Sequence, residues 1–359
     1  MSEVASPPER HIAVIFGGPS NEHEVSLASA QSVLRQLQAP GWDVLTVGVG
    51  KDGRWYVGPD AHASLVRQAD PALLPLGVES PEGDLDQVRV YDRAPGADVF
   101  AGYEIAFPVS HGHWGEDGTL QGLLSSYGLT IVGCGVTASA VCYDKRMAKA
   151  VLSGAGLPVT PGFGVTAQDW ASDRSLAQQS PGEGPWFVKP NRSGSSIGVI
   201  GPVTTAELPA AIDATLTFDD SVLVEEYIPH RELLVGVLGS EKLTVSPPLE
   251  AIQQDEVLAY EEKYLQGKLR FAPPAGLSAE LLEQVDRLAH AAFRALGCDI
   301  IARVDFFVDT RSGRLMINEV NTIPGLTASS VFAQLMAAAG LPYATALEQM
   351  YDLAEEKRR

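Results

Sequence analysis

The chain has 359 residues, of which 45% are hydrophobic and 20% are charged, and its formal net charge is −19 at pH 7. The length predicts two or three domains, and the excess of acidic side chains argues against nucleic acid or an anionic membrane as a partner. The sequence has no run of about eighteen apolar residues that predicts a membrane span. Any anionic substrate must therefore meet a local cluster of cations.

Three cysteines, Cys134, Cys142 and Cys298, do not have the spacing of a metal site. An odd number of cysteines without such spacing is typical of reduced thiols. The first ten residues also lack the basic and apolar regions of a secretion signal. Together these features predict a cytoplasmic protein.

The first part of the chain has the pattern of an α/β layer, in which strands alternate with helices. Strands are predicted at 11–18, 42–49, 103–112 and 129–135, and helices at 24–37 and about 119–127. Residues 58–100 are rich in Pro, Gly and Asp and have weak strand and helix signals. We therefore expect an insertion there.

Two further units follow along the chain. The second begins with a helix at 144–156 and contains a strand at 221–228. The third contains the clearest helix, at 278–297, with Ser278 as its N-cap and Gly297 as its stop. The predicted domains are residues 1–142, 143–232 and 233–359.

Residues 300–325 predict a β-hairpin, because two runs of alternating polarity flank the turn sequence TRSGR at 310–314. With that turn as the loop, Asp305 faces Glu319 and Arg303 faces Asn321, all on one side of the sheet. The opposite side is then apolar, and it consists of Ile300, Ala302, Val304, Phe306 and Val308.

Two carboxylates directly opposite each other destabilise a sheet unless a cation lies between them. Oxygen ligands from Asp305, Glu319 and Asn321 suit Mg²⁺, which takes the rest of its ligands from water and from substrate phosphates. The alternative is a solvated face whose charges pair with Arg303. A slip of one residue in the register would remove the pairing.

A second candidate site is VKPNRSGSSIGV at 188–199, a basic loop rich in glycine and serine between two predicted strands. Lys189, Arg192 and the backbone amides of 194–198 could bind phosphates beside a metal ion. Taken alone, such a loop is more often an ordinary mobile turn. The phosphate interpretation therefore depends on the acidic hairpin.

The sequence GCGVTA at 133–138 fits the glycine pattern of a dinucleotide-binding turn. That interpretation requires an acidic residue about twenty positions further on, and residues 145–168 contain neither Asp nor Glu. A tight strand-to-helix turn is the simpler interpretation. A nicotinamide-dependent oxidoreductase remains the alternative from a different class of enzyme.

These pieces, in this order, resemble the ATP-grasp superfamily and, within it, the D-alanine–D-alanine ligase family. The matching segments are 17–27, 111–122, 144–152, 188–199, 260–264, 302–307 and 318–327. The resemblance implies an α/β protein of three domains, with an N-terminal Rossmann-like domain and two α+β domains that clasp ATP. It also implies a homodimer.

The resemblance implies that ATP phosphorylates the carboxylate of one D-alanine and that the amine of a second D-alanine attacks the acyl phosphate. The product would be D-alanyl-D-alanine, for peptidoglycan precursor synthesis. Asp305, Glu319 and Asn321 would hold two Mg²⁺ or Mn²⁺ ions. Arg303 would stabilise the oxyanion of the tetrahedral intermediate.

The resemblance also implies a nucleotide site and two amino-acid sites. For ATP the implied residues are Lys145 and Lys189 at the phosphates, Ser195 and Ser196 in the closing loop, Glu225, Glu226 and Ile228 around adenine, and Glu232 at the ribose. For the amino acids they are Glu24 at the first ammonium group, His111 at the first carboxylate, and Gly325, Ser330 and Lys263 around the second D-alanine. Without the resemblance, Glu225 and Glu226 would be interpreted as a charged strand end.

The second substrate of such an enzyme could be D-alanine or D-lactate, and a D-alanine–D-lactate ligase is the alternative within the family. In dipeptide-forming relatives a tyrosine reaches a serine, which reaches the glutamate at the first substrate. Here the matching residues are Tyr264, Ser195 and Glu24. Ester-forming relatives typically have a histidine in the equivalent stretch, and residues 256–272 contain none. We therefore predict dipeptide synthesis, although Tyr264 could instead merely pack the loop.

Overall fold

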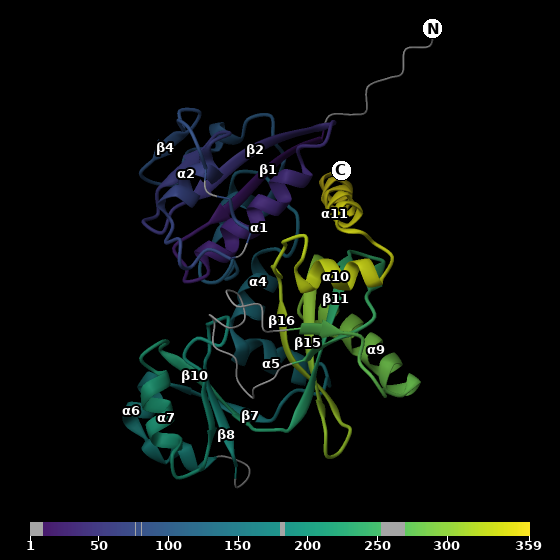
Figure 1. Ribbon diagram of the computed structural model, residues 1–359. Coiled ribbons are helices and arrows are strands. Elements are labelled where there is room, and N and C mark those ends of the chain that lie inside the picture. The colour runs from purple at the N-terminus through teal and green to yellow at the C-terminus, as the bar shows by residue number, and fades with distance from the viewer. Residues whose placement is uncertain (1–9, 76, 80, 180–183, 253–269) are drawn as a thin grey trace.

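Figure 1 shows the computed structural model, which describes residues 10–75, 77–79, 81–179, 184–252 and 270–359. Three β-sheets follow one another along the chain, and each is covered by helices. An α/β layer is followed by two units with antiparallel sheets. This arrangement confirms the predicted fold class.

The first sheet is mixed. Its strands are β1 Arg10–Gly17, β2 Trp42–Val49, β3 Trp55–Val57, β4 Arg89–Tyr91, β5 Ile105–Pro108 and β6 Thr130–Ile131, in the order β4-β3-β2-β1-β5-β6. The four strands β2, β1, β5 and β6 are parallel, as an α/β layer requires, and β3 and β4 add an antiparallel edge. Strand β1 is apolar and buried along most of its length, as expected for a strand covered on both faces.

The helices of this unit are α1 His23–Gln36, α2 Ala61–Gln68, α3 Thr119–Ser126 and α4 Val136–Tyr143, with a short 3₁₀ helix at Ala97–Phe100. The insertion expected at 58–100 contains α2 and β4, so it is more regular than its weak signals indicated. Leu65 and Val66 of α2 are buried in the core beneath the sheet, which explains why this short helix forms.

The second sheet is antiparallel and carries the glycine-rich loop. Its strands are β7 Gly162–Thr166, β8 Trp186–Pro190, β9 Ile200–Val203 and β10 Ser221–Glu226, in the order β7-β10-β8-β9. Its helices are α5 Lys145–Gly154, α6 Ala167–Ser172 and α7 Leu208–Thr215, with a 3₁₀ helix at Arg174–Gln179. The loop joins the neighbouring strands β8 and β9, as predicted.

The third unit contains the acidic hairpin. Its strands are β11 His230–Gly239, β12 Leu243–Val245, β13 Leu249–Ile252, β14 Arg270–Ala272, β15 Ile300–Asp309 and β16 Leu315–Asn321. Its helices are α9 Ala279–Ala295, α10 Val331–Ala338 and α11 Tyr343–Arg358. Ser278 caps α9 as predicted, because its hydroxyl accepts a hydrogen bond from Leu281 N at 3.2 Å. The predicted domain borders remain predictions, and the one after residue 232 lies inside β11.

The hairpin of β15 and β16 has the predicted pairing at its polar residues: Asp305 faces Glu319, and Arg303 faces Asn321. An irregularity after Asp305 shifts the rest of the ladder by one residue, so that Phe306 faces Ile317. The predicted straight register is therefore wrong towards the turn. The apolar face is confirmed, since Ala302, Val304 and Phe306 are fully buried.

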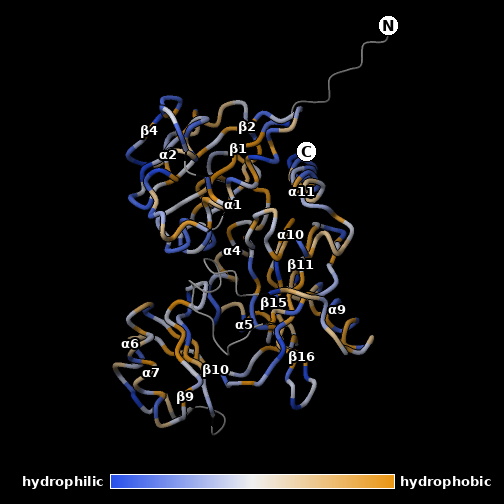
Figure 2. The backbone as a smooth tube through the Cα atoms, in the orientation of Figure 1, coloured by the Kyte–Doolittle hydropathy of each residue, from blue (hydrophilic) through white to orange (hydrophobic). Residues whose placement is uncertain are grey.

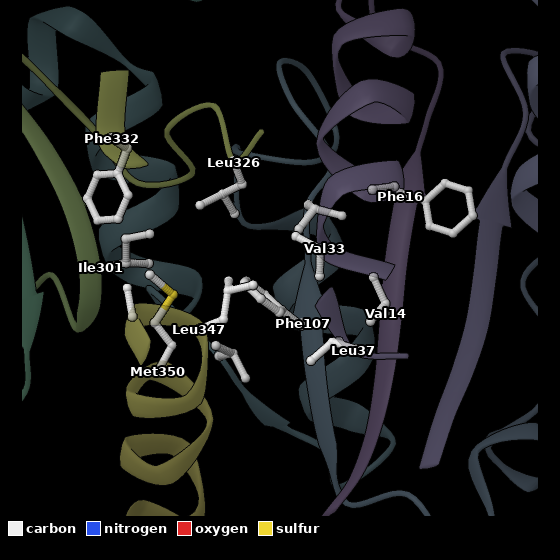
Figure 3. Packing of buried hydrophobic residues seen from close by; sticks show 14 of the residues in the cluster. Val14, Phe16, Val33, Leu37, Phe107, Ile301, Leu326, Phe332, Leu347 and Met350 are labelled. Carbon is white, nitrogen blue, oxygen red and sulfur yellow. The ribbon is translucent and has the colours of Figure 1, made fainter. Parts of the chain in front are cut away.

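Helix α11 joins the first and third units in one hydrophobic core (Figure 3). Leu347 and Met350 of this helix lie between Phe107 of β5 and Ile301 of β15. At the rim, the ring of Tyr351 packs edge-on against Trp42 with 5.0 Å between ring centroids. Figure 2 shows hydrophobic segments in the interior of each unit. None of the helices in the described part of the chain is long and apolar enough to cross a membrane.

Replacing Phe293 by alanine should lower the free energy of unfolding by about 3–5 kcal/mol, because the ring of Phe293 is fully buried between α9 and the third sheet. The matched control is Leu282→Ala on the same helix, whose side chain is 38% exposed. This control should change stability by about 0.5 kcal/mol or less. Urea unfolding followed by circular dichroism measures both, and equal losses would contradict the assigned packing.

Candidate active site

Charged residues from all three units meet beside the polar face of the β15–β16 hairpin. The hydroxyl of Ser195, in the glycine-rich loop, donates a hydrogen bond of 2.5 Å to Glu22 Oε1 at the start of α1. Lys145 at the start of α5 lies 3.9 Å from Glu319 Oε2 on β16. Burial raises the pKa of Glu22, against the hydrogen bond from Ser195 and the charge of Lys145. The candidate site therefore lies where the three units adjoin.

Asp305 is the most buried of the four polar residues that face one another on the hairpin, with 1% of its surface exposed. The guanidinium group of Arg303 donates two hydrogen bonds to the Asp305 carboxylate, from Nε at 2.7 Å and from Nη2 at 2.6 Å. The side-chain amide of Asn321 donates a third, at 3.1 Å. Burial raises the pKa of Asp305 against the attraction of Arg303. Two predicted metal ligands, Asp305 and Asn321, thus form one network with the predicted oxyanion-stabilising residue Arg303, and Glu319 faces Asp305 across the hairpin.

The oxygen atoms of Asp305, Glu319 and Asn321 form a donor set that fits a hard cation such as Mg²⁺. Among the residues that the structure describes, no three His, Cys, Asp or Glu side chains are arranged to hold a metal ion by themselves. Two carboxylates and one amide would leave ligand positions for water and phosphate oxygens. That division is usual for Mg²⁺ in sites that act on phosphates.

The glycine-rich loop has a strained backbone and lies against the first unit. Ser195 and Ser196 have φ angles of 55° and 60°, in the left-handed region that non-glycine residues rarely adopt. At Gly194 a Cβ atom would lie only 2.7 Å from Glu22 Oε2. A glycine there allows the close approach that brings Ser195 to Glu22.

The expected contact between Ser195 and Glu24 is wrong, since Glu22 accepts the hydrogen bond instead. Glu24 is buried, and its Oε1 lies 2.7 Å from Nζ of Lys51, which follows β2. Helix α1 begins at His23, so Glu22 precedes the first turn and Glu24 lies within it. Residues two positions apart on a helix do not share a face, and the two glutamates therefore reach different partners.

The sequence analysis did not single out two further residues of the site, although they lie inside segments that resemble the ligase family. Glu116 accepts a hydrogen bond from Gly112 N at 2.6 Å. Burial and the nearby Glu22 carboxylate raise the pKa of Glu116 to about 8. The second missed residue is Lys149, one helical turn after Lys145. Its side chain is only 11% exposed, and it forms an ion pair with Glu225.

The start of the loop and the strand before it are held by residues that the sequence marked as cationic. Arg192 is paired with Asp219, at 2.6 Å, and with Asp220, so it anchors the start of the loop. Lys145 Nζ donates a hydrogen bond of 2.5 Å to the carbonyl of Ser193. Lys189 forms an ion pair of 2.7 Å with Glu225.

Of the residues expected around adenine and ribose, Glu225 and Glu232 lie close to Lys189. Glu226 ends β10, and Ile228 is buried directly after it. Glu232 on β11 pairs across the sheet with Phe307 and is close enough to raise the pKa of Lys189. The ring of Phe307 lies 5.9 Å from Lys189 Nζ and is stacked on His230, with 3.6 Å between ring centroids.

His111 is buried, and both of its ring nitrogens have protein partners. Nδ1 lies 3.2 Å from the carbonyl of Ile323, and Nε2 lies 3.0 Å from the hydroxyl of Ser29. Nδ1 therefore carries the hydrogen and Nε2 accepts one from Ser29. Burial lowers the pKa of His111 to about 4, so the ring is neutral at pH 7. It ties the first unit to the segment that leads into α10.

The residues expected around the second D-alanine are only partly described. Gly325 and Ser330 are neighbours, since a Cβ at Gly325 would lie 3.9 Å from Ser330 Cβ. Ser330 caps α10 by accepting a hydrogen bond from Ala333 N at 3.3 Å. Lys263 and Tyr264 lie outside the described residues.

The sequence GCGVTA forms the turn from β6 into α4, as the simpler interpretation predicted. Gly133 in this turn has a φ of 124°. Cys134 beside it packs against the third unit, with its Sγ 3.4 Å from the carbonyl oxygen of Ile301. The turn is therefore part of the core between two units.

Family models described as "D-ala D-ala ligase N-terminus" and "D-ala D-ala ligase C-terminus" match residues 11–134 and 151–352. The chain is 38% identical to the D-alanine–D-alanine ligase of Chlorobium phaeovibrioides, over 96% of this chain and 97% of the relative. It is 39% identical to the D-alanine–D-alanine ligase of Deinococcus radiodurans, over 98% of this chain and 100% of the relative.

Solved structures agree with these matches. The D-alanine–D-alanine ligase from Coxiella burnetii has a TM-score of 0.77 at 30% identity and covers 99% of this chain and 95% of its own. The VanG D-Ala:D-Ser ligase from Enterococcus faecalis has a TM-score of 0.77 at 31% identity and covers 96% and 99%. With both family models and near-complete relatives in agreement, the chain belongs to the D-alanine–D-alanine ligase family.

Proposed function

We propose that this chain joins two D-alanine molecules into D-alanyl-D-alanine, with ATP as the energy source and an acyl phosphate as the intermediate. The observation that carries this proposal is the hydrogen bond between Ser195 and Glu22, beside the Arg303–Asp305 pair. This contact brings the glycine-rich loop and Glu22 to the same hairpin, which supports a phosphate-binding loop beside a subsite for an amino acid. A carboxylate bound there would lie close to the transferred phosphate.

The nucleotide would be held by side chains that neutralise and orient it, which is most of what phosphoryl transfer requires. The proposed contacts are Lys145, Lys189, Ser195 and Ser196 at the phosphates, Glu225, Glu226 and Ile228 at adenine, and Glu232 at the ribose. Two Mg²⁺ or Mn²⁺ ions held by Asp305, Glu319 and Asn321 would offset the charge of the phosphates. Lys145 lies near this donor set already.

The first D-alanine would place its ammonium group at Glu22 instead of Glu24. Glu22 faces the loop and the hairpin, whereas Glu24 is engaged by Lys51. His111 would lie near the substrate carboxylate as a neutral group. It would hold the adjoining segment through its bond to the carbonyl of Ile323. The carboxylate then attacks the terminal phosphorus of ATP, and ADP leaves.

In the second half of the reaction, the amine of the second D-alanine attacks the carbonyl carbon of the acyl phosphate. A C–N bond forms, and Arg303 would stabilise the negative charge on the former carbonyl oxygen. The C–O bond to phosphate then breaks, and the proton lost by the amine leaves with the phosphate. Gly325, Ser330 and Lys263 would position the second D-alanine, with Tyr264 and Ser195 at the closing loop. We also propose a homodimer located in the cytoplasm, with the dipeptide destined for peptidoglycan precursors.

The metal ligands are tested with Asp305→Asn and Glu319→Gln. Each variant should lose at least about 100-fold in activity, because loss of a charged ligand removes several kcal/mol of charge stabilisation. Release of ADP in the presence of ATP, Mg²⁺ and D-alanine is the measurement. Asp286→Asn and Glu283→Gln on the exposed face of α9 are the matched controls. Near-normal turnover in both hairpin variants, or no ADP release by the unaltered protein, would refute the proposal.

The choice between the two glutamates is tested by comparing Glu22→Gln with Glu24→Gln. Glu22→Gln should raise the KM of the first D-alanine roughly 10- to 100-fold, because it removes a charge-assisted contact to the ammonium group. Glu24→Gln should mainly lower the melting temperature, since it breaks the buried pair with Lys51. A larger KM effect from Glu24→Gln would restore the original assignment.

The alternative second substrate, D-lactate, is tested by competition at pH 7 with D-alanine, with the products separated by mass. We expect dipeptide with little ester, because residues 256–272 contain no histidine that would attract an anion. D-serine is a useful third competitor, since a D-Ala:D-Ser ligase is among the similar structures. Comparable yields of ester and dipeptide would favour the D-alanine–D-lactate ligase.

A further inference from the structure

A buried carboxylate in the proposed nucleotide site is bridged by two lysines. Glu225 on β10 has 2% of its side chain exposed. Its Oε2 lies 2.7 Å from Nζ of Lys189 on β8, and its Oε1 is paired with Lys149 on α5. The two lysine side chains are 19% and 11% exposed. The proposed function uses Lys189 and Glu225 but gives no role to Lys149.

Further charges reach this cluster from two elements, β11 and β16. Glu232 on β11 and Glu319 on β16 both raise the pKa of Lys189, and Glu319 also acts on Lys149. On the remaining side β7 contributes Gly162, where a Cβ would lie 3.1 Å from Glu225 Cγ. Gly162 itself carries no charge. The imidazole of His230 on β11 also faces Lys189, and burial and that lysine lower its pKa. Lys149 and Lys189 are the cations that balance Glu225.

We propose that Lys149 is a positioning residue that keeps Glu225 ionised when Lys189 turns to the nucleotide phosphates, so that Glu225 selects a purine with an amino group at C6. This inference rests on the proposed placement of adenine beside Glu225. An ionised carboxylate only accepts hydrogen bonds. It binds the amino group of adenine and repels the carbonyl oxygen that inosine carries at the same position.

The electrostatics of the free protein agree with this division of roles. Burial alone would raise the pKa of Glu225. The positive charge of Lys149, and to a smaller extent that of Lys189, lowers it by more, so that the pKa is about 2. If Lys189 moves to the phosphates, Lys149 is the remaining counterion. Without it, a carboxylate in this buried place would bind a proton as the pH falls. Protonated Glu225 could donate to a carbonyl oxygen, and selectivity would be lost.

Direct binding separates this role from catalysis. The imido analogues of ATP and of inosine triphosphate, which are not hydrolysed, are titrated into the full chain with Mg²⁺ by calorimetry from pH 6 to pH 9. We expect the unaltered protein to prefer the adenine analogue by ~10- to 100-fold, the range for a hydrogen bond to a charged group. In Lys149→Met the preference should fall to about threefold or less at pH 6 and recover towards pH 9, as Glu225 loses its proton.

Three further variants serve as controls. Lys149→Arg keeps the charge and should keep the preference at every pH. Lys242→Met makes the same change at an exposed lysine in another part of the fold and should have no effect. Glu225→Gln should abolish the preference at every pH, because an amide both donates and accepts hydrogen bonds. If circular dichroism shows that Lys149→Met does not fold, the adenine preference is measured in Lys149→Gln instead and compared with that of Glu225→Gln.

Several outcomes would overturn the inference. One is an unchanged preference in Lys149→Met, with both analogues weakened equally, which would mean that Lys149 only supports the fold. Another is equal binding of the adenine and inosine analogues by the unaltered protein. Failure of the ligation proposal is distinguishable, because it would leave selective binding intact while no dipeptide forms from D-alanine. Conversely, normal dipeptide synthesis with unchanged selectivity in Lys149→Met would refute only the inference.

Discussion

The structure depends on the neutralisation of carboxylates that the fold removes from water. Glu24, Glu225 and Asp305 are all buried, and an unpaired buried charge costs several kcal/mol. Each therefore requires a cation at a fixed place: Lys51 after β2, two lysines on α5 and β8, and Arg303 two residues away on the same strand. Because the lysines that pair with Glu24 and Glu225 lie on other elements than the glutamates, the positions of strands and helices around the site are coupled to one another.

The same constraint explains why the loop and the hairpin lie together. Glu22 is desolvated near Glu116 and Glu319, and the hydroxyl of Ser195 is the donor that stabilises it. Gly194 permits the backbone to come this close. A group that brings its own positive charge, such as an ammonium ion, would relieve the repulsion among these acids. The cluster of acids around Glu22 therefore adjoins the glycine-rich loop and Lys145.

Sequence reasoning succeeded where the signal is local. The hairpin pairing of Asp305 with Glu319 follows from alternation and a clear turn, and the cap of α9 follows from one serine. The irregularity after Asp305 leaves no trace in the polarity pattern, so the straight register failed beyond it. Short strands such as β3 and β12 are too brief for a periodic pattern, and packing against their neighbours determines them.

The errors at the site concern residues whose roles are set by distant parts of the chain. Glu22 and Glu24 have the same chemistry, and the start of α1 together with a loop about 170 residues later decides which one meets Ser195. Lys149 has the spacing of an ordinary solvated helix position. Its burial results from the packing of α5 against the second and third units, which no single stretch of sequence encodes.

Helix α11 covers β5 and β6 of the first sheet, although about 210 residues separate β6 from α11 in the chain. During synthesis at roughly 5–20 residues per second, that separation corresponds to a delay on the order of 10 to 40 s. For this interval Phe107 and its neighbours lack the side chains of Leu347 and Met350 that pack beside them in the finished core. Of the three units, the one that is synthesised first is therefore among the last to complete its core.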